Sequence, residues 1–291
     1  MIYTAKEINE ISKNKEIFND YDYFSQVDEI TSAILKDIQE KPVILINGPS
    51  GASKTTLTQN LVKRLNEKGK KCYCISMDNY FYSIDPKEYA NGASPDYEYP
   101  LRVEFPLLNE HIKKLLNYES INMPTFDFSR SVRSDKTVEI KREKDSLIFI
   151  EGIHSFNTDY LNTEHALKVY VDLFDEVQGA GEKIGSRKIR LLRRISRDYL
   201  TRGRKFSQTI NQFENVSEGE DLYIKPFLND VDFSVNSFLP YELGCYKTAL
   251  EEKLKSIDEE KLSDAKKILS VVDFVSLSNV KEFSPIKEFI K

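Results

Sequence analysis

Residues 43–56, VILINGPSGASKTT, contain the residue types of a phosphate-binding loop. In the usual pattern, G-x-x-x-x-G-K-[ST], backbone N–H groups surround the phosphates, the lysine contacts them and the hydroxyl reaches Mg²⁺. An ordinary turn between a strand and a helix is the alternative interpretation. The candidate phosphate-binding residues are Gly48, Pro49, Ser50, Gly51, Ala52, Ser53, Lys54, Thr55 and Thr56.

Ser53 departs from this pattern, because it stands where the second glycine is expected. A side chain at a left-handed backbone position costs about 1 kcal/mol and crowds the backbone where phosphate approaches. We therefore expect Ser53 to weaken nucleotide binding by about tenfold without abolishing it.

Two acids follow apolar runs that are typical of buried strands: Asp78 after CYCISM and Glu151 after LIFI. The carboxyl ends of parallel strands meet at one edge of a sheet, where ligands bind. Asp78 could accept the proton of a hydroxyl group that attacks phosphorus, and Glu151 could help to hold Mg²⁺. Alone, Asp78 would more commonly be an N-cap or turn residue, and Glu151 could be a surface residue at a strand end. Together with Lys54 and Thr55 they indicate one site, with Thr55, Glu151 and Asp78 as candidate metal ligands.

The segment IRLLRRISRDYLTRGR carries six arginines. Helical periodicity places Arg190, Arg194 and Arg197 on one face and apolar residues on the opposite face. Arg202 and Arg204 follow on either side of a glycine. A solvated basic face and a nucleic-acid surface are alternatives. Because arginine binds phosphate oxygens in pairs, we favour a lid that closes over a phosphoryl group.

The elements that must position these residues alternate between short apolar runs and amphipathic helical patterns. This alternation predicts an α/β fold with a doubly wound, mainly parallel sheet and helices on both faces. We expect an N-terminal helical segment over residues 1–40, packed on one domain over residues 41–291. Within that domain we expect a β-hairpin insertion at about 119–143, the arginine-bearing lid at about 186–212 and C-terminal helices at about 240–291.

The bulk composition narrows the classes of function. The net charge is -5, which disfavours a nucleic-acid partner. The three cysteines give no disulfide framework, and no apolar run reaches the roughly 20 residues that a membrane span requires. The charged N-terminal stretch lacks the apolar core of a signal peptide. We expect a cytoplasmic protein with no membrane contact, and a homo-oligomer remains compatible with the sequence.

Five motifs in this order, GPS…KTT, DNYF, PTFDF, EGIH and RLLRRI.RDY..RG, resemble the uridine kinase/phosphoribulokinase family of P-loop kinases. The resemblance extends from about Val43 to Lys247 and is strongest to bacterial uridine kinase-like nucleoside kinases. It implies a P-loop NTPase-type fold and Mg²⁺- and ATP-dependent phosphoryl transfer to a small metabolite, with the 5′-hydroxyl of a nucleoside as the first candidate. Phosphoribulokinase- or pantothenate kinase-like acceptors are alternatives, as is a nucleotide-binding pseudokinase, which Ser53 motivates.

The same resemblance assigns roles to individual residues. It implies a catalytic set of Asp78, Lys54, Arg197 and Arg202, and adds Arg194 and Arg204 to the phosphate-binding residues. The expected substrate-binding residues are Asp78, Tyr80, Phe81, Phe126, Asp127, Arg133, His154, Arg197 and Gln212. Phe126 and Ser131 stand where uridine kinases have a tyrosine and a histidine near the base, and Phe81 stands where tyrosine is frequent. The residues for phosphoryl transfer therefore match the family more closely than those for base recognition.

Overall fold

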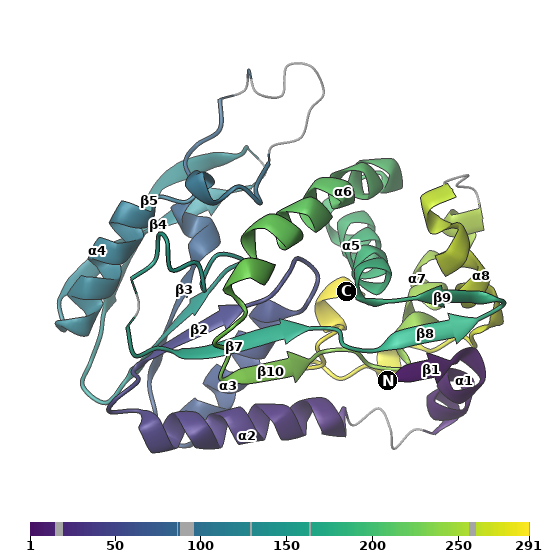
Figure 1. The fold of residues 1–291 in the computed structure, drawn as a ribbon, viewed down its shortest axis with the longest axis horizontal. Coiled ribbons are helices and arrows are strands. Elements are labelled where there is room, and N and C mark those ends of the chain that lie inside the picture. Colours follow the sequence, from purple (N-terminus) through teal and green to yellow (C-terminus); the bar gives the residue numbers. More distant parts are fainter. Residues whose placement is uncertain are drawn as a thin grey trace.

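The structure is a computed structural model that describes residues 1–14, 20–85, 87, 96–128, 130–162, 164–255 and 260–290. Its centre is a sheet of five parallel strands in the order β10-β7-β2-β6-β3 (Figure 1). The strands are β2 (Val43–Asn47), β3 (Cys72–Ser76), β6 (Leu147–Glu151), β7 (Leu167–Asp172) and β10 (Phe233–Asn236). The predicted α/β fold class is confirmed.

Helices cover both faces of this sheet, so its central strands are buried. All five residues of β2 are buried. Along β2, Ile44 and Ile46 belong to one hydrophobic core, and Val43 and Leu45 belong to the other. This explains why the strand is continuously apolar in the sequence.

The helices divide between these two cores. They are α1 (Ala5–Lys13), α2 (Tyr21–Asp37), α3 (Lys54–Glu67), α4 (Phe105–Leu116), α5 (Ser186–Arg202), α6 (Phe206–Tyr223), α7 (Glu242–Lys255) and α8 (Ser263–Val271). The buried apolar side chains of α2, α3, α5 and α7 belong to the first core, whereas those of α4 belong to the second. Figure 1 shows α2 along one face of the sheet and α4 near the hairpin at one end. Within the described ranges, no helix has both the length and the apolar character needed to cross a bilayer.

The expected hairpin consists of β4 (Ser120–Asp127) and β5 (Val132–Lys141), which pair antiparallel. The register shifts between Pro124 and Phe126. Since proline cannot donate a ladder hydrogen bond, an irregularity at this point is physically expected. The hairpin reaches the region that follows β3, where Arg133 N–H donates to Ser83 Oγ at 2.9 Å.

The sequence patterns did not indicate a second, three-stranded sheet, which lies at the opposite end of the molecule from the hairpin (Figure 1). It consists of β1 (Ile2–Thr4), β8 (Glu176–Gly179) and β9 (Glu182–Ile184). β1 pairs parallel with β8, and β8 pairs antiparallel with β9. The first forty residues thus contain a short strand as well as helices.

Candidate functional site

The phosphate-loop sequence connects β2 to the N-terminus of α3, as the pattern requires. Gly48 passes so close to β7 that a Cβ atom there would lie 2.1 Å from the backbone oxygen of Val171. Gly51 has a left-handed backbone with φ +85°. Glycine is therefore needed at both positions, and the alternative of an arbitrary turn does not explain why the loop packs so closely on its neighbours.

Lys54 is the first residue of α3 and points back over the loop. Its Nζ donates hydrogen bonds to Gly48 O at 2.8 Å and Pro49 O at 3.3 Å. Burial lowers the pKa of Lys54, while the carboxylates of Glu151, Asp78 and Glu98 oppose this shift. The lysine thus lies among the acids that the sequence predicted to converge.

Thr55 and Glu151 also meet, although 96 positions separate them. Thr55 Oγ1 donates to Glu151 Oε1 at 2.9 Å, and Thr58 Oγ1 donates to the other carboxylate oxygen at 3.2 Å. A hydroxyl and a carboxylate at this edge are hard oxygen donors that suit Mg²⁺. No group of three acidic, histidine or cysteine side chains with metal-binding geometry occurs among the described residues. A magnesium ion here would therefore need further oxygen ligands from phosphate and water.

Ser53 adopts the left-handed conformation that the missing glycine would have had, with φ 70° and ψ 35°. Its side chain does not face the phosphate side of the loop. Ser53 Oγ donates to Pro285 O at 2.7 Å and accepts a hydrogen bond from Arg193 Nη1 at 3.1 Å. The residue is only 2% exposed. Both hydrogen bonds of the Ser53 hydroxyl go to other parts of the fold, and the expected effect of its Cβ on nucleotide binding stays a prediction.

The C-terminal segment, residues 283–290, makes further contacts with α3. Thr56 Oγ1 donates to Glu288 Oε2 at 3.1 Å, and Asn60 Nδ2 donates to Phe283 O at 3.0 Å. The side chain of Thr56, a predicted phosphate-binding residue, therefore faces this segment. Together with the bond from Ser53, these contacts tie the phosphate loop to residues more than 200 positions later.

Two arginines of α5 lie underneath the loop and are fully buried. Arg190 Nη1 donates to Ser50 O at 3.2 Å and forms ion pairs with Asp172 and Glu220. Arg193 Nη1 donates to Gly51 O at 3.0 Å. A basic face exposed to solvent is therefore the wrong description of this part of α5, because these charges are neutralised inside the protein.

Arg193 has a dense set of partners. Its Nε donates to Glu242 Oε2 at 2.7 Å, and its Nη2 donates to Ser237 O at 2.7 Å. Glu242 is fully buried as well. This pair connects the phosphate loop to the start of α7.

The other four arginines line a cavity of about 280 Å³ beyond the carboxyl ends of the strands. These are Arg194, Arg197, Arg202 and Arg204. Ser50 and Lys54 of the phosphate loop border the same cavity, as does Gln212, which accepts a hydrogen bond from Arg204 at 3.1 Å. Burial and the nearby charge of Arg197 lower the pKa of Arg194 to about 10. This cavity wall is strongly cationic, as binding of a polyphosphate requires.

Asp198 organises these arginines. It is fully buried and forms ion pairs with Arg197 at 3.1 Å, Arg202 at 3.4 Å and Arg204 at 3.9 Å. Burial alone would raise the pKa of Asp198, but the arginine charges outweigh burial and lower it. The carboxylate therefore holds the guanidinium groups together against their mutual repulsion.

Asp78 and residues of an aromatic cluster border the same cavity. Asp78 follows β3 in a short 3-10 helix, Met77–Tyr80. Burial raises the pKa of its carboxyl group, and the charges of Lys54 and Arg202 oppose that rise. The acid, the lysine and the arginines are thus brought together around one space.

The aromatic cluster consists of Phe81, Tyr97, Phe126 and Phe128. Their ring centroids are 5.0 to 6.4 Å apart, mostly in edge-to-face arrangements. Tyr97 also shares a 2.7 Å hydrogen bond with Ser131 Oγ. Phe81, Tyr97 and Phe128 line the cavity, as do Asp96 and Glu98.

Several predicted substrate-binding residues do not line this cavity. Tyr80 is fully buried in the second core, where its hydroxyl bonds to His111 Nδ1 at 2.9 Å. The prediction for Tyr80 is wrong because the 3-10 turn places Asp78 at the cavity and Tyr80 in the core. Arg133 is engaged with Glu104 and donates to the backbone oxygen of Tyr80 at 2.7 Å. It holds the hairpin to the segment after β3.

Three further predicted residues also lie outside the cavity lining. Phe126 supports the aromatic cluster from behind and is 9% exposed. Asp127 pairs with Arg130 at 2.7 Å in the hairpin turn. His154 is 1% exposed, and burial lowers its pKa to about 4, so its imidazole is neutral. None of the three side chains lines the cavity.

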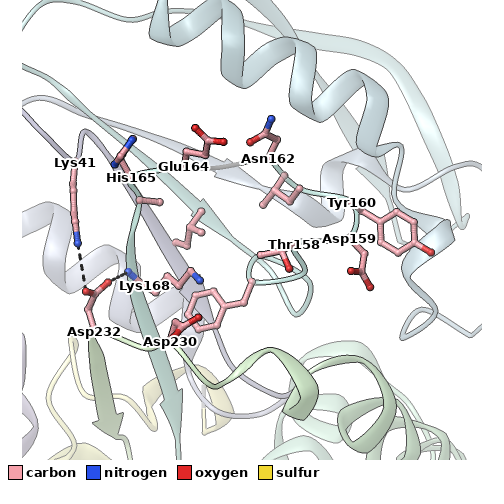
Figure 2. A pocket seen from close by; sticks show the side chains of 14 residues that line it. Lys41, Thr158, Asp159, Tyr160, Asn162, Glu164, His165, Lys168, Asp230 and Asp232 are labelled. Atoms are coloured by element: carbon pink, nitrogen blue, oxygen red, sulfur yellow. Dashed lines mark hydrogen bonds and ion pairs between the residues drawn. The ribbon is translucent and has the colours of Figure 1, made fainter.

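A larger cavity, of about 700 Å³, lies at the opposite edge of the sheet (Figure 2). It is bordered by Lys41, just before β2, and by Ala166 and Lys168 at the start of β7. Its charges are partly paired, since Lys41 Nζ lies 3.4 Å from Asp232. Ligands of such sheets bind beyond the carboxyl ends of the strands, so this cavity is not the candidate site.

Comparison with known proteins agrees with this geometry. The model of the phosphoribulokinase/uridine kinase family matches residues 43–240. The chain belongs to this kinase family. A uridine kinase from Lactobacillus johnsonii is 30% identical over 198 residues, which are 67% of this chain and 87% of that protein. One from Lactobacillus helveticus is 34% identical over 176 residues, covering 60% and 76% of the two chains.

Solved structures share the fold of this family. A possible uridine kinase from Bacillus stearothermophilus superimposes with a TM-score of 0.50 at 19% identity, covering 73% of this chain and 98% of that one. D-glycerate 3-kinase from Cryptococcus neoformans gives a TM-score of 0.50 at 15% identity, covering 72% and 92%. At these identities the likeness concerns the fold alone.

Within this kinase fold, sequence reasoning missed four residues that shape the site: Arg193, Asp198, Tyr97 and Glu98. Asp198 could have been found, because a single acid among six arginines suggests a shared counter-ion. Arg193 lay outside the predicted cationic face, and its partner Glu242 is distant in the sequence. Nothing local marked Tyr97 or Glu98.

Proposed function

We propose that the protein is an ATP-dependent kinase that phosphorylates a hydroxyl group of a small neutral acceptor, with the 5′-hydroxyl of a uridine- or cytidine-like nucleoside as the first candidate. Membership of the kinase family supports phosphoryl transfer. The observation that carries the proposal is that Asp78, Lys54 and four arginines border one cavity. An acid opposite a cationic phosphate site is what hydroxyl phosphorylation requires.

On the donor side, backbone N–H groups of the loop at Gly48–Thr55 would bind the phosphates of ATP. Lys54 would exchange its bonds to Gly48 O and Pro49 O for phosphate oxygens. Arg194, Arg197, Arg202 and Arg204 would neutralise the charge that develops as the phosphoryl group moves. Thr55 and Glu151 would hold Mg²⁺, directly or through water, and the bound metal would supply further charge neutralisation.

On the acceptor side, Asp78 would orient the attacking hydroxyl and accept its proton. Burial raises the pKa of Asp78, which makes its carboxylate a stronger base, and the charges of Lys54 and Arg202 oppose that rise without a fixed salt bridge among the described contacts. Positioning of this kind contributes more to phosphoryl transfer than covalent chemistry by the protein.

The acceptor wall favours a neutral, partly aromatic molecule. Phe81, Tyr97 and Phe128 offer ring surface against which a base could pack. Asp96 and the ionised form of Glu98, which also line the cavity, would repel a phosphate ester or a carboxylate. This disfavours ribulose 5-phosphate and pantothenate as acceptors, compared with a nucleoside.

The decisive experiment is an acceptor screen with Mg·ATP over ribonucleosides, deoxynucleosides, ribulose 5-phosphate and pantothenate. We expect product from a pyrimidine nucleoside. In Asp78→Asn, turnover should fall by about 10²- to 10⁴-fold, while the Kd for ATP from calorimetry changes little. Asp22→Asn, an exposed aspartate at the start of α2, serves as the control.

Two results would contradict the proposal. If Asp78→Asn retains turnover within a factor of a few, Asp78 is not the base. If ATP binds but no acceptor is phosphorylated, a nucleotide-binding protein without turnover becomes the better description.

A further inference from the structure

The C-terminal segment, residues 283–290, lies outside the range 43–240 that the kinase family model matches. It contains a 3-10 turn, Lys287–Phe289, that packs against α5 (Figure 1). Ser284, Ile286 and Phe289 are fully buried. Ile286 and Phe289 belong to the first core, which also contains Ala52 of the phosphate loop. A segment outside the family match is therefore part of the core beside the loop.

Contacts with several elements hold this segment in place. Besides the hydrogen bond from α3 to the backbone of the segment, Ser284 shares a hydroxyl–hydroxyl hydrogen bond of 3.4 Å with Tyr241, which directly precedes α7. The guanidinium group of Arg193 in α5 lies 5.2 Å from the ring centroid of Phe289. The segment is thus fixed to α3, α5 and the start of α7, so it can act as a rigid partner for the loop.

Ser53 receives its support from this rigid partner. Its backbone has φ 70°, a conformation that a residue with a side chain populates about fivefold less often than its ordinary ones, or more rarely still. Ser53 Oγ donates to Pro285 O at 2.7 Å. Because the segment holds this carbonyl in place, the hydrogen bond stabilises the left-handed conformation in which the two groups meet. That is the conformation for which phosphate loops ordinarily use glycine.

The segment also contacts the first turn of α3, where backbone N–H groups would face the phosphates. Glu288 Oε2 accepts a hydrogen bond from Thr56 Oγ1 at 3.1 Å. The loop and the helix that follows it are therefore held at two positions, three residues apart, by one short segment.

We propose that the C-terminal segment is a positioning element of the donor site: it holds Ser53 in the left-handed conformation and so replaces the missing glycine of the phosphate loop. This inference rests on the donor side of the proposed function, the binding of ATP by the loop. Pro285 positions the loop through Ser53, and Glu288 positions the first turn of α3 through Thr56. When the segment detaches, Ser53 leaves the left-handed conformation, and the affinity for ATP falls with the fraction of loops that keep the binding conformation.

The first test loosens the segment without touching the loop. In full-length Ile286→Ala, the Kd for Mg·ATP from calorimetry should rise about fivefold or more. Ile112→Ala is the matched control, because it removes the same atoms from a buried position of α4 in the second core. Its Kd for Mg·ATP should stay within about twofold of the wild-type value.

The second test repeats the first in a Ser53→Gly background. Glycine adopts the left-handed conformation without help, so adding Ile286→Ala there should change the Kd for Mg·ATP by less than about twofold. A merely structural role of the segment would give the same fold-change in both backgrounds, because the two substitutions would then act independently.

The third test needs no variant and applies even if Ile286→Ala does not fold. Coupling between two sites is reciprocal, so ATP must stabilise the docked segment by the factor by which docking raises ATP affinity. Saturating Mg·ATP should slow amide hydrogen exchange in residues 283–290 of the wild-type protein about fivefold or more. Exchange in α8 is the internal control and should not change.

The outcomes separate the inference from the proposed function. If the wild-type protein binds ATP, the inference alone is refuted by an unchanged Kd in Ile286→Ala, by equal fold-changes in the two backgrounds, or by exchange in residues 283–290 that ATP does not slow. If the wild-type protein does not bind ATP, the donor side of the proposed function fails and the inference fails with it. If the coupling to ATP is found but no acceptor is phosphorylated, the inference is upheld and the proposed phosphoryl transfer fails.

Discussion

Replacing Ser53 by glycine tests whether the serine in the phosphate loop is a handicap or a structural anchor. Glycine would remove about 1 kcal/mol of strain from the left-handed backbone. Its greater conformational freedom in the unfolded chain would offset most of this stabilisation. The substitution also removes the bonds to Pro285 O at 2.7 Å and from Arg193 at 3.1 Å. The bond from the guanidinium is worth about 1.5 kcal/mol or more and the other about 1 kcal/mol.

The net result is a destabilisation of about 2 kcal/mol. For a chain of this size we expect the Tm of Ser53→Gly to fall by about 3–4 °C. ATP affinity, measured by calorimetry, should not increase, because the serine side chain faces the C-terminal segment and not the phosphates. Ser53→Ala is the matched control: it loses the same bonds without relief of strain, so its Tm should be no higher than that of the glycine variant.

The opposite result would refute this reasoning. If Ser53→Gly melts at a higher temperature than the wild type and binds ATP more than about threefold more tightly, the serine is a tolerated handicap. Its two hydrogen bonds would then contribute too little to offset the backbone strain.

Two further predictions concern buried charges. Arg193→Met should destabilise the protein by about 3–5 kcal/mol in urea unfolding, because Glu242 stays buried without its cation. The double variant Arg193→Met/Glu242→Leu should recover part of this stability. A loss of less than about 1 kcal/mol in the single variant would contradict the prediction. Because the pKa of Glu98 is raised to about 7 in the folded protein, its contribution to stability is present below about pH 4 and is lost as the pH rises through 7. Glu98→Gln should therefore gain stability relative to the wild type by up to about 3 kcal/mol between pH 4.5 and pH 8, and parallel pH dependences of the two proteins would contradict the assignment.

The parts of the fold that sequence predicted well are those where local pattern and burial agree. β2 and β6 are continuously apolar because both faces of the sheet are covered, and the phosphate loop is recognisable because its backbone geometry demands particular residues. The short strands β1, β8 and β9 have three or four residues each, too few for a periodic signal.

The sequence predicted which side chains converge only where each stands on its own loop or strand end, as at Lys54, Thr55, Asp78 and Glu151. Tyr80 is two residues from Asp78, yet a single 3-10 turn sends the two side chains in different directions. The burial of Arg193 depends on Glu242, and the orientation of Ser53 depends on Pro285. Such long-range partners leave no trace in a local pattern.

The tie between the phosphate loop and the C-terminal segment has a consequence for the order in which the protein can fold. Ser53 and Pro285 are 232 positions apart. During synthesis the loop emerges long before the residues that fix it, so the Ser53 hydroxyl must stay solvated while most of the chain is made. Contacts of such large sequence separation form slowly and late. The residues of the nucleotide site therefore lie early in the chain, but their contacts are completed among the last steps of folding. In a nascent chain that lacks residues 283–290, the phosphate loop lacks the hydrogen bonds that this segment provides.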